Sequence, residues 1–155
     1  MTRWWIFALG LLMALGFATS QAAGVLKLSR TELTLEPGKP RGALTVENVG
    51  DTPLYLDVQQ EWVANPGHTP EDRVPAGEVA APSLLVIPDR LALGPGQAYQ
   101  MTVKELQTPP QTRVWRVTFQ PRERIVVDAS QPGDTPAPVF ISVGYGVVIY
   151  QLSGN

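Results

Sequence analysis

The sequence contains 155 residues, of which 44% are hydrophobic and 17% charged, a globular composition whose length suits a single domain. Its formal net charge is −2 and it has no basic run, which argues against nucleic acid as a partner because phosphate binding requires a clustered positive face. The chain has no Cys, which excludes disulfides and thiol nucleophiles.

Residues 1–22 are predicted to be a secretory signal peptide. A short positive region ends at Arg3, an apolar run covers 4–17, and small residues precede an expected cut after Ala22. A transmembrane anchor is the alternative, but this run is shorter than the roughly 20 residues that span a bilayer. We therefore expect residues 23–155 to form an exported, soluble domain, and a domain without disulfides fits a bacterial periplasm.

The expected domain begins with alternating apolar and polar residues, which predict strands. In VLKLSRTELTL, one leucine pair at 26 and 28 and a second at 33 and 35 indicate two strand segments with a change of face between them. Residues 43–50 and 53–63 predict the next two strands. Turn formers between them, NVGDTP, predict that these two pair as a hairpin.

The next segment, residues 64–83, contains four prolines and is predicted to be a long surface loop, in which Val74 or Val79 could contribute a short edge strand. Strand character returns in LLVIPDRLAL, in AYQMTVKEL, and in TRVWRVTFQPRER. In the last of these, Trp115, Val117 and Phe119 are predicted to share one face. The segment IVVDASQPGDTPAP is predicted to be a proline-rich connection before the final strand.

About seven strands and no clear helix predict an all-β fold, a seven-stranded immunoglobulin-like β-sandwich. An internal echo supports this: LTLEPGKPRGALTV and LALGPGQAYQMTV share Leu-x-Leu-x-Pro-Gly, a polar gap and Thr-Val. We interpret the echo as one strand, tight turn, strand unit used twice rather than as a duplicated domain.

Groups that could support catalysis are few. His68 is the only imidazole and lies in the proline-rich loop, with only Glu71 and Asp72 near it as further metal ligands. The carboxylates of the first strands have no spacing that requires acid and base roles, and no phosphate loop or triad-like pattern is present. The sequence therefore predicts a protein that is not an enzyme, with no cofactor and no metal.

The final run, VFISVGYGVVIYQLSGN, is apolar and strand-like. Val139, Ile141 and Val143 form one apolar row, whereas residues 147–150 are apolar on both faces and are predicted to lie in the core. Two interpretations stay open. The whole strand is an ordinary core strand, or its first half is an open edge that pairs with another chain.

The order of these segments resembles the N-terminal domain of the periplasmic chaperones of the chaperone–usher pathway, which assemble pili. The resemblance rests on five stretches in order: LKLSRTELTL, ALTVENVGDTPLYLDVQQEWV, LLVIPDRLALGPGQAYQMTV, TRVWRVTFQP and VFISVGYGVVIYQL. It implies an immunoglobulin-like sandwich in the periplasm whose seventh strand is lent to a pilin subunit until an outer-membrane usher exchanges it. Val139, Ile141 and Val143 would then be the subunit-binding residues.

Two departures from that family are visible. The family anchors the subunit's terminal carboxylate with a basic pair, but the matching positions here are Glu32 and Val148. Arg30 or Lys27 is a possible substitute anchor. The family also has a second immunoglobulin-like domain, which is not expected here beyond Asn155.

Two functions follow as hypotheses. The first is a periplasmic chaperone-like protein that binds and stabilises pilin or fimbrial subunits by lending an edge strand. The alternative is a structural or adhesive envelope protein that self-associates through the same edge.

Overall fold

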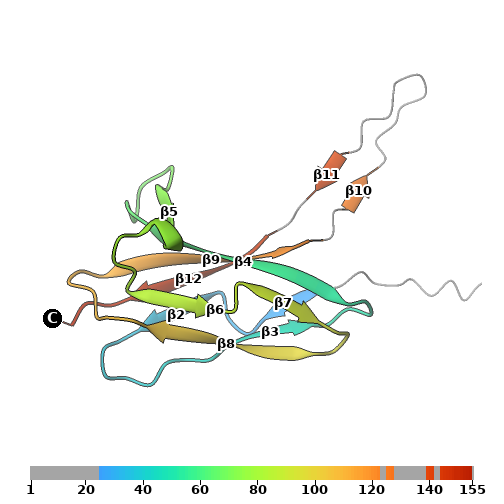
Figure 1. Ribbon diagram of the computed structural model, residues 1–155, viewed down its shortest axis with the longest axis horizontal. Helices are drawn as coiled ribbons and strands as arrows, with labels where there is room; N and C mark the ends of the chain where they lie inside the picture. The colour runs from blue at the N-terminus through green and yellow to red at the C-terminus, as the bar shows by residue number, and fades with distance from the viewer. Residues whose placement is uncertain (1–24, 123–124, 128–138, 142–143, 155) are drawn as a thin grey trace, which may run out of the picture.

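The computed structural model describes residues 25–122, 125–127, 139–141 and 144–154. The predicted signal peptide lies outside them. The described residues form a single two-layer β-sandwich, which confirms the predicted fold class (Figure 1).

One layer is a four-stranded sheet. Its order is β1 (Leu26–Leu28), β3 (Leu44–Asn48), β8 (Ala98–Glu105), β6 (Leu84–Ile87), with every neighbouring pair antiparallel. β1 and β6 are therefore the edge strands of this layer.

The other layer is a six-stranded sheet. Its order is β2 (Glu32–Leu35), β12 (Tyr145–Gln151), β9 (Arg113–Pro121), β4 (Leu54–Val63), β5 (Arg73–Pro75), and β7 (Arg90–Leu93) also pairs with β4. A 3-10 helix, η1 (Ala76–Glu78), follows β5. β10 (Ile125–Val127) and β11 (Val139–Ile141) form a separate two-stranded sheet, hereafter the arm, which stands away from both layers in Figure 1.

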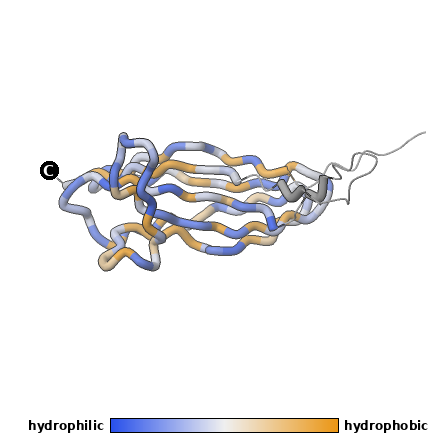
Figure 2. Tube along the Cα trace, turned by 90° about the horizontal axis from the view of Figure 1, so that it is seen from above, coloured by the Kyte–Doolittle hydropathy of each residue, from blue (hydrophilic) through white to orange (hydrophobic). Residues whose placement is uncertain are grey.

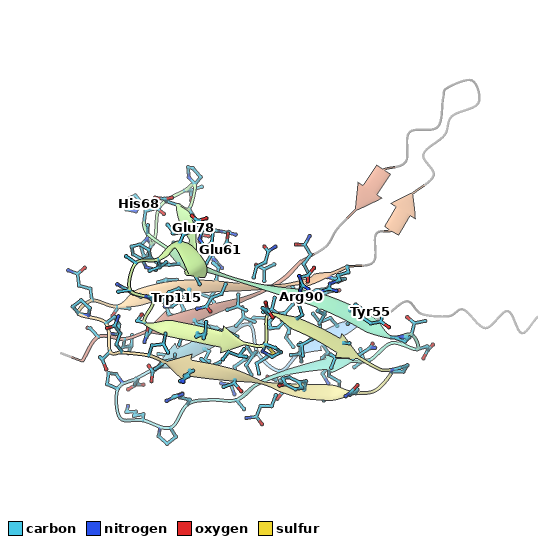
Figure 3. All side chains as sticks on the ribbon, in the orientation of Figure 1. Tyr55, Glu61, His68, Glu78, Arg90 and Trp115 are labelled. Atoms are coloured by element: carbon cyan, nitrogen blue, oxygen red, sulfur yellow. The ribbon has the colours of Figure 1, made fainter. Side chains whose placement is uncertain are left out.

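The core lies between the layers and follows the alternation of the strands, which Figure 2 shows as alternating hydropathy along the chain. On β9, Trp115, Val117 and Phe119 are fully buried whereas Val114 and Arg116 are half-buried on the opposite face, as the sequence predicts. Figure 3 shows Trp115 between the two sheets. We call the faces that point away from this core the outer faces.

Twelve strands replace the seven that were predicted, because several predicted strands are divided between the sheets. LLVIPDRLAL divides at Pro88 into β6 and β7, which lie in different layers. The change of face in the first segment is confirmed, since β1 and β2 also lie in different layers. Val74 lies in the edge strand β5, as one of the two options for that loop predicts.

The predicted hairpin between residues 43–50 and 53–63 is wrong, because β3 and β4 belong to different sheets. Buried Asn48 directs this crossing. Its Nδ2 donates to Thr52 O at 2.8 Å and to Leu93 O at 3.0 Å, and its Oδ1 accepts from Gly50 N at 3.0 Å. Turn-forming residues favour a change of direction, but they do not fix whether the next strand returns to the same sheet.

The internal echo is confirmed as a unit that occurs twice. Gly38 and Gly96 occupy the same place in the two turns, and both have φ of 73°, a left-handed conformation that glycine adopts without strain. Each unit leads from a strand of the six-stranded sheet, β2 or β7, to a strand of the four-stranded sheet, β3 or β8. The shared motif therefore encodes a crossing between layers.

Candidate functional site: the free edge of β12

β12 lies between two strands that cover it unequally. It pairs with β9 along its whole length, from Tyr145 opposite Phe119 to Gln151 opposite Arg113. Parallel pairing with β2 covers only Val148 to Gln151. The first three residues of β12 thus have a neighbour on one side only.

The backbone groups at this uncovered part can be assigned from the ladder. Val148 N donates to Thr31 O, and Leu152 N donates to Leu35 O, both at 2.9 Å, so the even-numbered residues bond toward β2. Peptide groups alternate along a strand, so the N–H and C=O of Gly146 face the same side, beyond the beginning of β2. No described residue bonds to them, and we call residues 145–147 on this side the free edge.

The side chains of β12 divide between the two faces. Val147 and Ile149 are fully buried in the core. Val148 and Tyr150 are half-buried on the outer face, so the prediction that all of residues 147–150 lie in the core is wrong for these two. A strand between two neighbours in one layer still has one face that only the outside can cover.

The arm continues the same part of the chain. β11 pairs antiparallel with β10, with Ile125 opposite Ile141, Val126 opposite Phe140 and Val127 opposite Val139. The sequence predicted residues 125–138 as a connection, which is wrong for β10. The predicted binding residues Val139 and Ile141 lie in β11, whereas Val143 lies outside the described residues. All six paired residues are apolar.

The two positions that match the family's basic pair are neighbours in the structure, since Val148 lies opposite Glu32. The two candidate substitutes are separated. Lys27 lies on β1 in the other sheet, with its Nζ 3.8 Å from Glu47 Oε2. Arg30 lies between β1 and β2, and its guanidinium packs over Gly42, where a Cβ would collide with it. The role of either residue as a carboxylate anchor stays a prediction.

Arg116, which sequence reasoning missed, is the cation beside these positions. It lies opposite Val148 on β9, and its Nη2 forms an ion pair with Glu71 Oε1. Glu71 also pairs with Arg73 Nη2 at 2.8 Å. The hydrogen bond from Arg116 is the largest cause, and that from Arg73 a smaller one, of a lowered Glu71 pKa. These pairs hold the proline-rich loop against the outer face of β9.

Glu71 gives a pH-dependent prediction. Its pKa is below the ordinary value of 4.5, so its stabilising contribution is present above that value and is lost as the pH falls through the folded-state pKa. We expect Glu71→Gln to lower the Tm at neutral pH and to show a smaller loss of Tm on acidification than the wild-type protein. Glu78→Gln is the control, because exposed Glu78 forms no ion pair among the described residues. Parallel Tm curves for wild type and Glu71→Gln from pH 7 to pH 3 would contradict this assignment.

The predicted absence of catalytic machinery concerns His68. It lies in the exposed loop, with Nδ1 3.3 Å from Pro66 O. Within the described ranges, no group of three or more His, Cys, Asp or Glu residues could hold a metal ion. The described part of the chain also has no helix with the length and hydropathy needed to cross a membrane.

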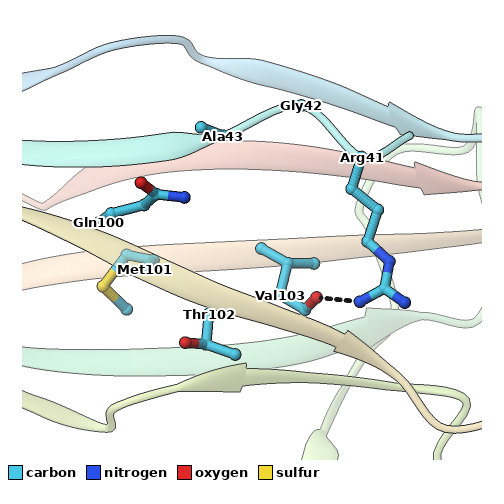
Figure 4. A pocket seen from close by; sticks show the side chains of 7 residues that line it. All are labelled: Arg41, Gly42, Ala43, Gln100, Met101, Thr102 and Val103. Atoms are coloured by element: carbon cyan, nitrogen blue, oxygen red, sulfur yellow. Dashed lines mark hydrogen bonds between the residues drawn. The ribbon is translucent and has the colours of Figure 1, made fainter.

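Other open strand edges in the described residues are closed by side chains. Where β3 diverges from β8, Arg41 Nη1 donates to Val103 O at 2.8 Å (Figure 4). On the far side of the same sheet, the Gln60 amide bonds to the edge of β6. The free edge of β12 differs from both, since no described side chain bonds to Gly146.

Comparisons with known proteins place the fold. No protein-family model matches the chain, and no curated protein matches it. Among solved structures, a chain of the chaperone–tip adhesin complex of CFA/I fimbriae biogenesis is 20% identical, with a TM-score of 0.65, and the match covers 86% of this chain and 59% of that one. The class 5 fimbriae chaperone CfaA is 18% identical, with a TM-score of 0.64 and coverages of 84% and 57%.

A third match is the Salmonella enterica SafA pilin in complex with the SafB chaperone, at 18% identity, a TM-score of 0.55 and coverages of 85% and 56%. The chain therefore spans little more than half the length of these chaperones, which corresponds to one of their domains. It has the PapD-like, immunoglobulin-like fold of the N-terminal domain of chaperone–usher pilus chaperones.

Proposed function

We propose that this protein is a periplasmic chaperone-like protein that binds a pilin or fimbrial subunit by adding β11 and the free edge of β12 to the subunit's sheet. In this mode of recognition, backbone hydrogen bonds supply affinity and the side chains of alternate residues supply fit. The contacting row would be Val139, Ile141 and Val143, and Gly146 would supply the last backbone bonds before β2 begins.

The observation that carries the proposal is the uncovered backbone of Gly146. An edge that is neither paired nor capped is a hazard that proteins normally remove by charge, proline or a covering side chain. This chain caps the exposed edges at β6 and β8 with Gln60 and Arg41, yet leaves this one open. An edge left open beside an apolar arm is typical of a surface that awaits another strand.

The comparisons support the class of partner. Among the solved matches are a SafB chaperone bound to the SafA pilin and a chaperone bound to the tip subunit of Csu pili. The chaperone SfaE, another match, is periplasmic. By analogy, the partner here is a pilin-type subunit, the compartment is the periplasm, and an outer-membrane usher is a further candidate partner.

Co-expression with a pilin-type subunit encoded beside this gene tests the proposal. We expect a 1:1 complex that survives size-exclusion chromatography. Recovery of this protein only as an oligomer of itself, with the subunit left aggregated, would instead favour the self-associating envelope protein.

A further inference from the structure

The edge of β6 lies on the other layer of the sandwich, away from the free edge of β12. β6 pairs with β8 on one side, from Leu84 opposite Glu105 to Ile87 opposite Thr102. On its other side, no described strand pairs with it. β6 therefore has an open row of backbone groups of its own.

A side chain occupies that row. Gln60, on β4 of the opposite sheet, donates from Nε2 to Leu84 O at 3.0 Å and accepts from Val86 N at Oε1 with a distance of 2.9 Å. One amide group thus satisfies both backbone groups, as a neighbouring strand would. Unlike a strand, a single side chain can turn away and leave the row available.

The surface of β6 suits a partner that is as apolar as itself. Its four residues carry no charge. Leu85 and Ile87 point to the outer face and are 38% and 41% exposed. The adjacent groove has a volume of about 480 Å³ and is lined on the β6 side by Leu85 and Val86 and across from them by Gln60, Ala76 and Asp89. An uncharged, apolar edge strand of this kind is a template for pairing.

We propose that β6 is a second strand-pairing edge and that its occupant is β6 of a second copy of this chain. In an antiparallel arrangement with Leu85 opposite its own counterpart, Leu84 and Val86 of each copy would exchange backbone hydrogen bonds. These bonds replace the ones to Gln60 in each copy. The number of hydrogen bonds is then conserved, and burial of the paired Leu85 side chains favours association.

Charge favours this two-fold arrangement. Asp89 lies just beyond one end of β6 and takes part in no printed ion pair. At the other end, Arg113 Nη1 donates to Ala81 O at 2.9 Å and lies 3.4 Å from Ser83 Oγ. Antiparallel pairing brings the Asp89 end of one copy to the Arg113 end of the other. Pro88 has no N–H and limits the pairing to a short segment, as suits a weak and reversible dimer.

Disulfide trapping tests this register, because the chain contains no Cys. In Leu85→Cys the two thiols would face each other across the symmetry axis, within the spacing that a disulfide requires. In Ile87→Cys, a control of nearly equal exposure on the same strand, each Cys would lie opposite Ser83 of the other copy, about 13 Å from its counterpart. We expect mild oxidation to give covalent dimers of Leu85→Cys at least about tenfold faster than of Ile87→Cys. Equal rates would overturn the proposal.

Gln60 and the arm supply two further readouts. Adding Gln60→Ala to Leu85→Cys removes the competing amide, so we expect dimer formation to become at least about tenfold faster. An unchanged rate would overturn the capping role of Gln60. Adding Ile141→Asp, which targets β11, should leave the trapped dimer intact. Loss of the dimer in that background would assign self-association to the arm and overturn the assignment to β6, whereas subunit binding is not measured in either experiment.

Discussion

Replacing Ile141 by aspartate is expected to abolish the complex with a pilin-type subunit. Ile141 lies in β11, in the middle of the row predicted to enter the subunit. Burying a carboxylate without a partner costs several kcal/mol, which corresponds to affinity weaker by at least about 1,000-fold. Co-purification of the tagged subunit with Ile141→Asp should therefore recover no chaperone-like protein, although the variant folds as the wild type does by circular dichroism.

Ser142→Asp is the matched control for this experiment. It introduces the same charge one residue along the chain, at a position that the sequence places in the opposite row. We expect Ser142→Asp to keep the complex. If both variants bind the subunit as the wild type does, the row at Val139, Ile141 and Val143 does not enter the subunit.

The second large effect concerns Gln151, at the end of β12. Its side chain is fully buried, with Nε2 donating to Ser83 O and to Gln107 O, both at 3.1 Å. Its Oε1 accepts from Ser83 Oγ at 2.6 Å and from Trp115 Nε1 at 3.4 Å. Ser83 and Gln107 flank β6 and β8, so one side chain ties the end of β12 to the other layer.

Gln151→Leu keeps the volume of the side chain but leaves several buried polar groups without a partner. We expect a loss of about 2–4 kcal/mol in the free energy of unfolding, measured by urea denaturation. Tyr150→Leu, on the same strand but half-exposed and outside this network, should change stability by less than about 1 kcal/mol. Equal losses for the two variants would show that the network contributes no more than the surface does.

The sequence predicts the faces of the fold better than its connections. Alternation on β9 correctly separated Trp115 and Phe119 from Arg116, because a strand with one buried face must alternate. The connection after Asn48 was not predictable in the same way. Its turn formers suit a hairpin and a crossing equally, and the choice depends on bonds from Asn48 to Leu93, far along the chain.

The candidate site shows the same limit. The row from Val139 was visible as a pattern, but the free edge depends on where β2 ends relative to Val148, and only the register gives that. β10 was missed because three apolar residues beside a proline-rich segment are too short to separate from a loop. The signal that could have found it is Ile-Val-Val, three β-branched residues in succession.

The amide of Gly146 tests the central claim most directly. Hydrogen exchange measured by NMR should show this amide exchanging rapidly in the free protein, because it has no partner among the described residues, whereas Val148 N–H, bonded to Thr31 O, is protected. In the complex with a pilin-type subunit, we predict that Gly146 exchange slows at least about tenfold while Val148 stays protected. Unchanged exchange at Gly146 in a stable complex would contradict strand addition at the free edge of β12.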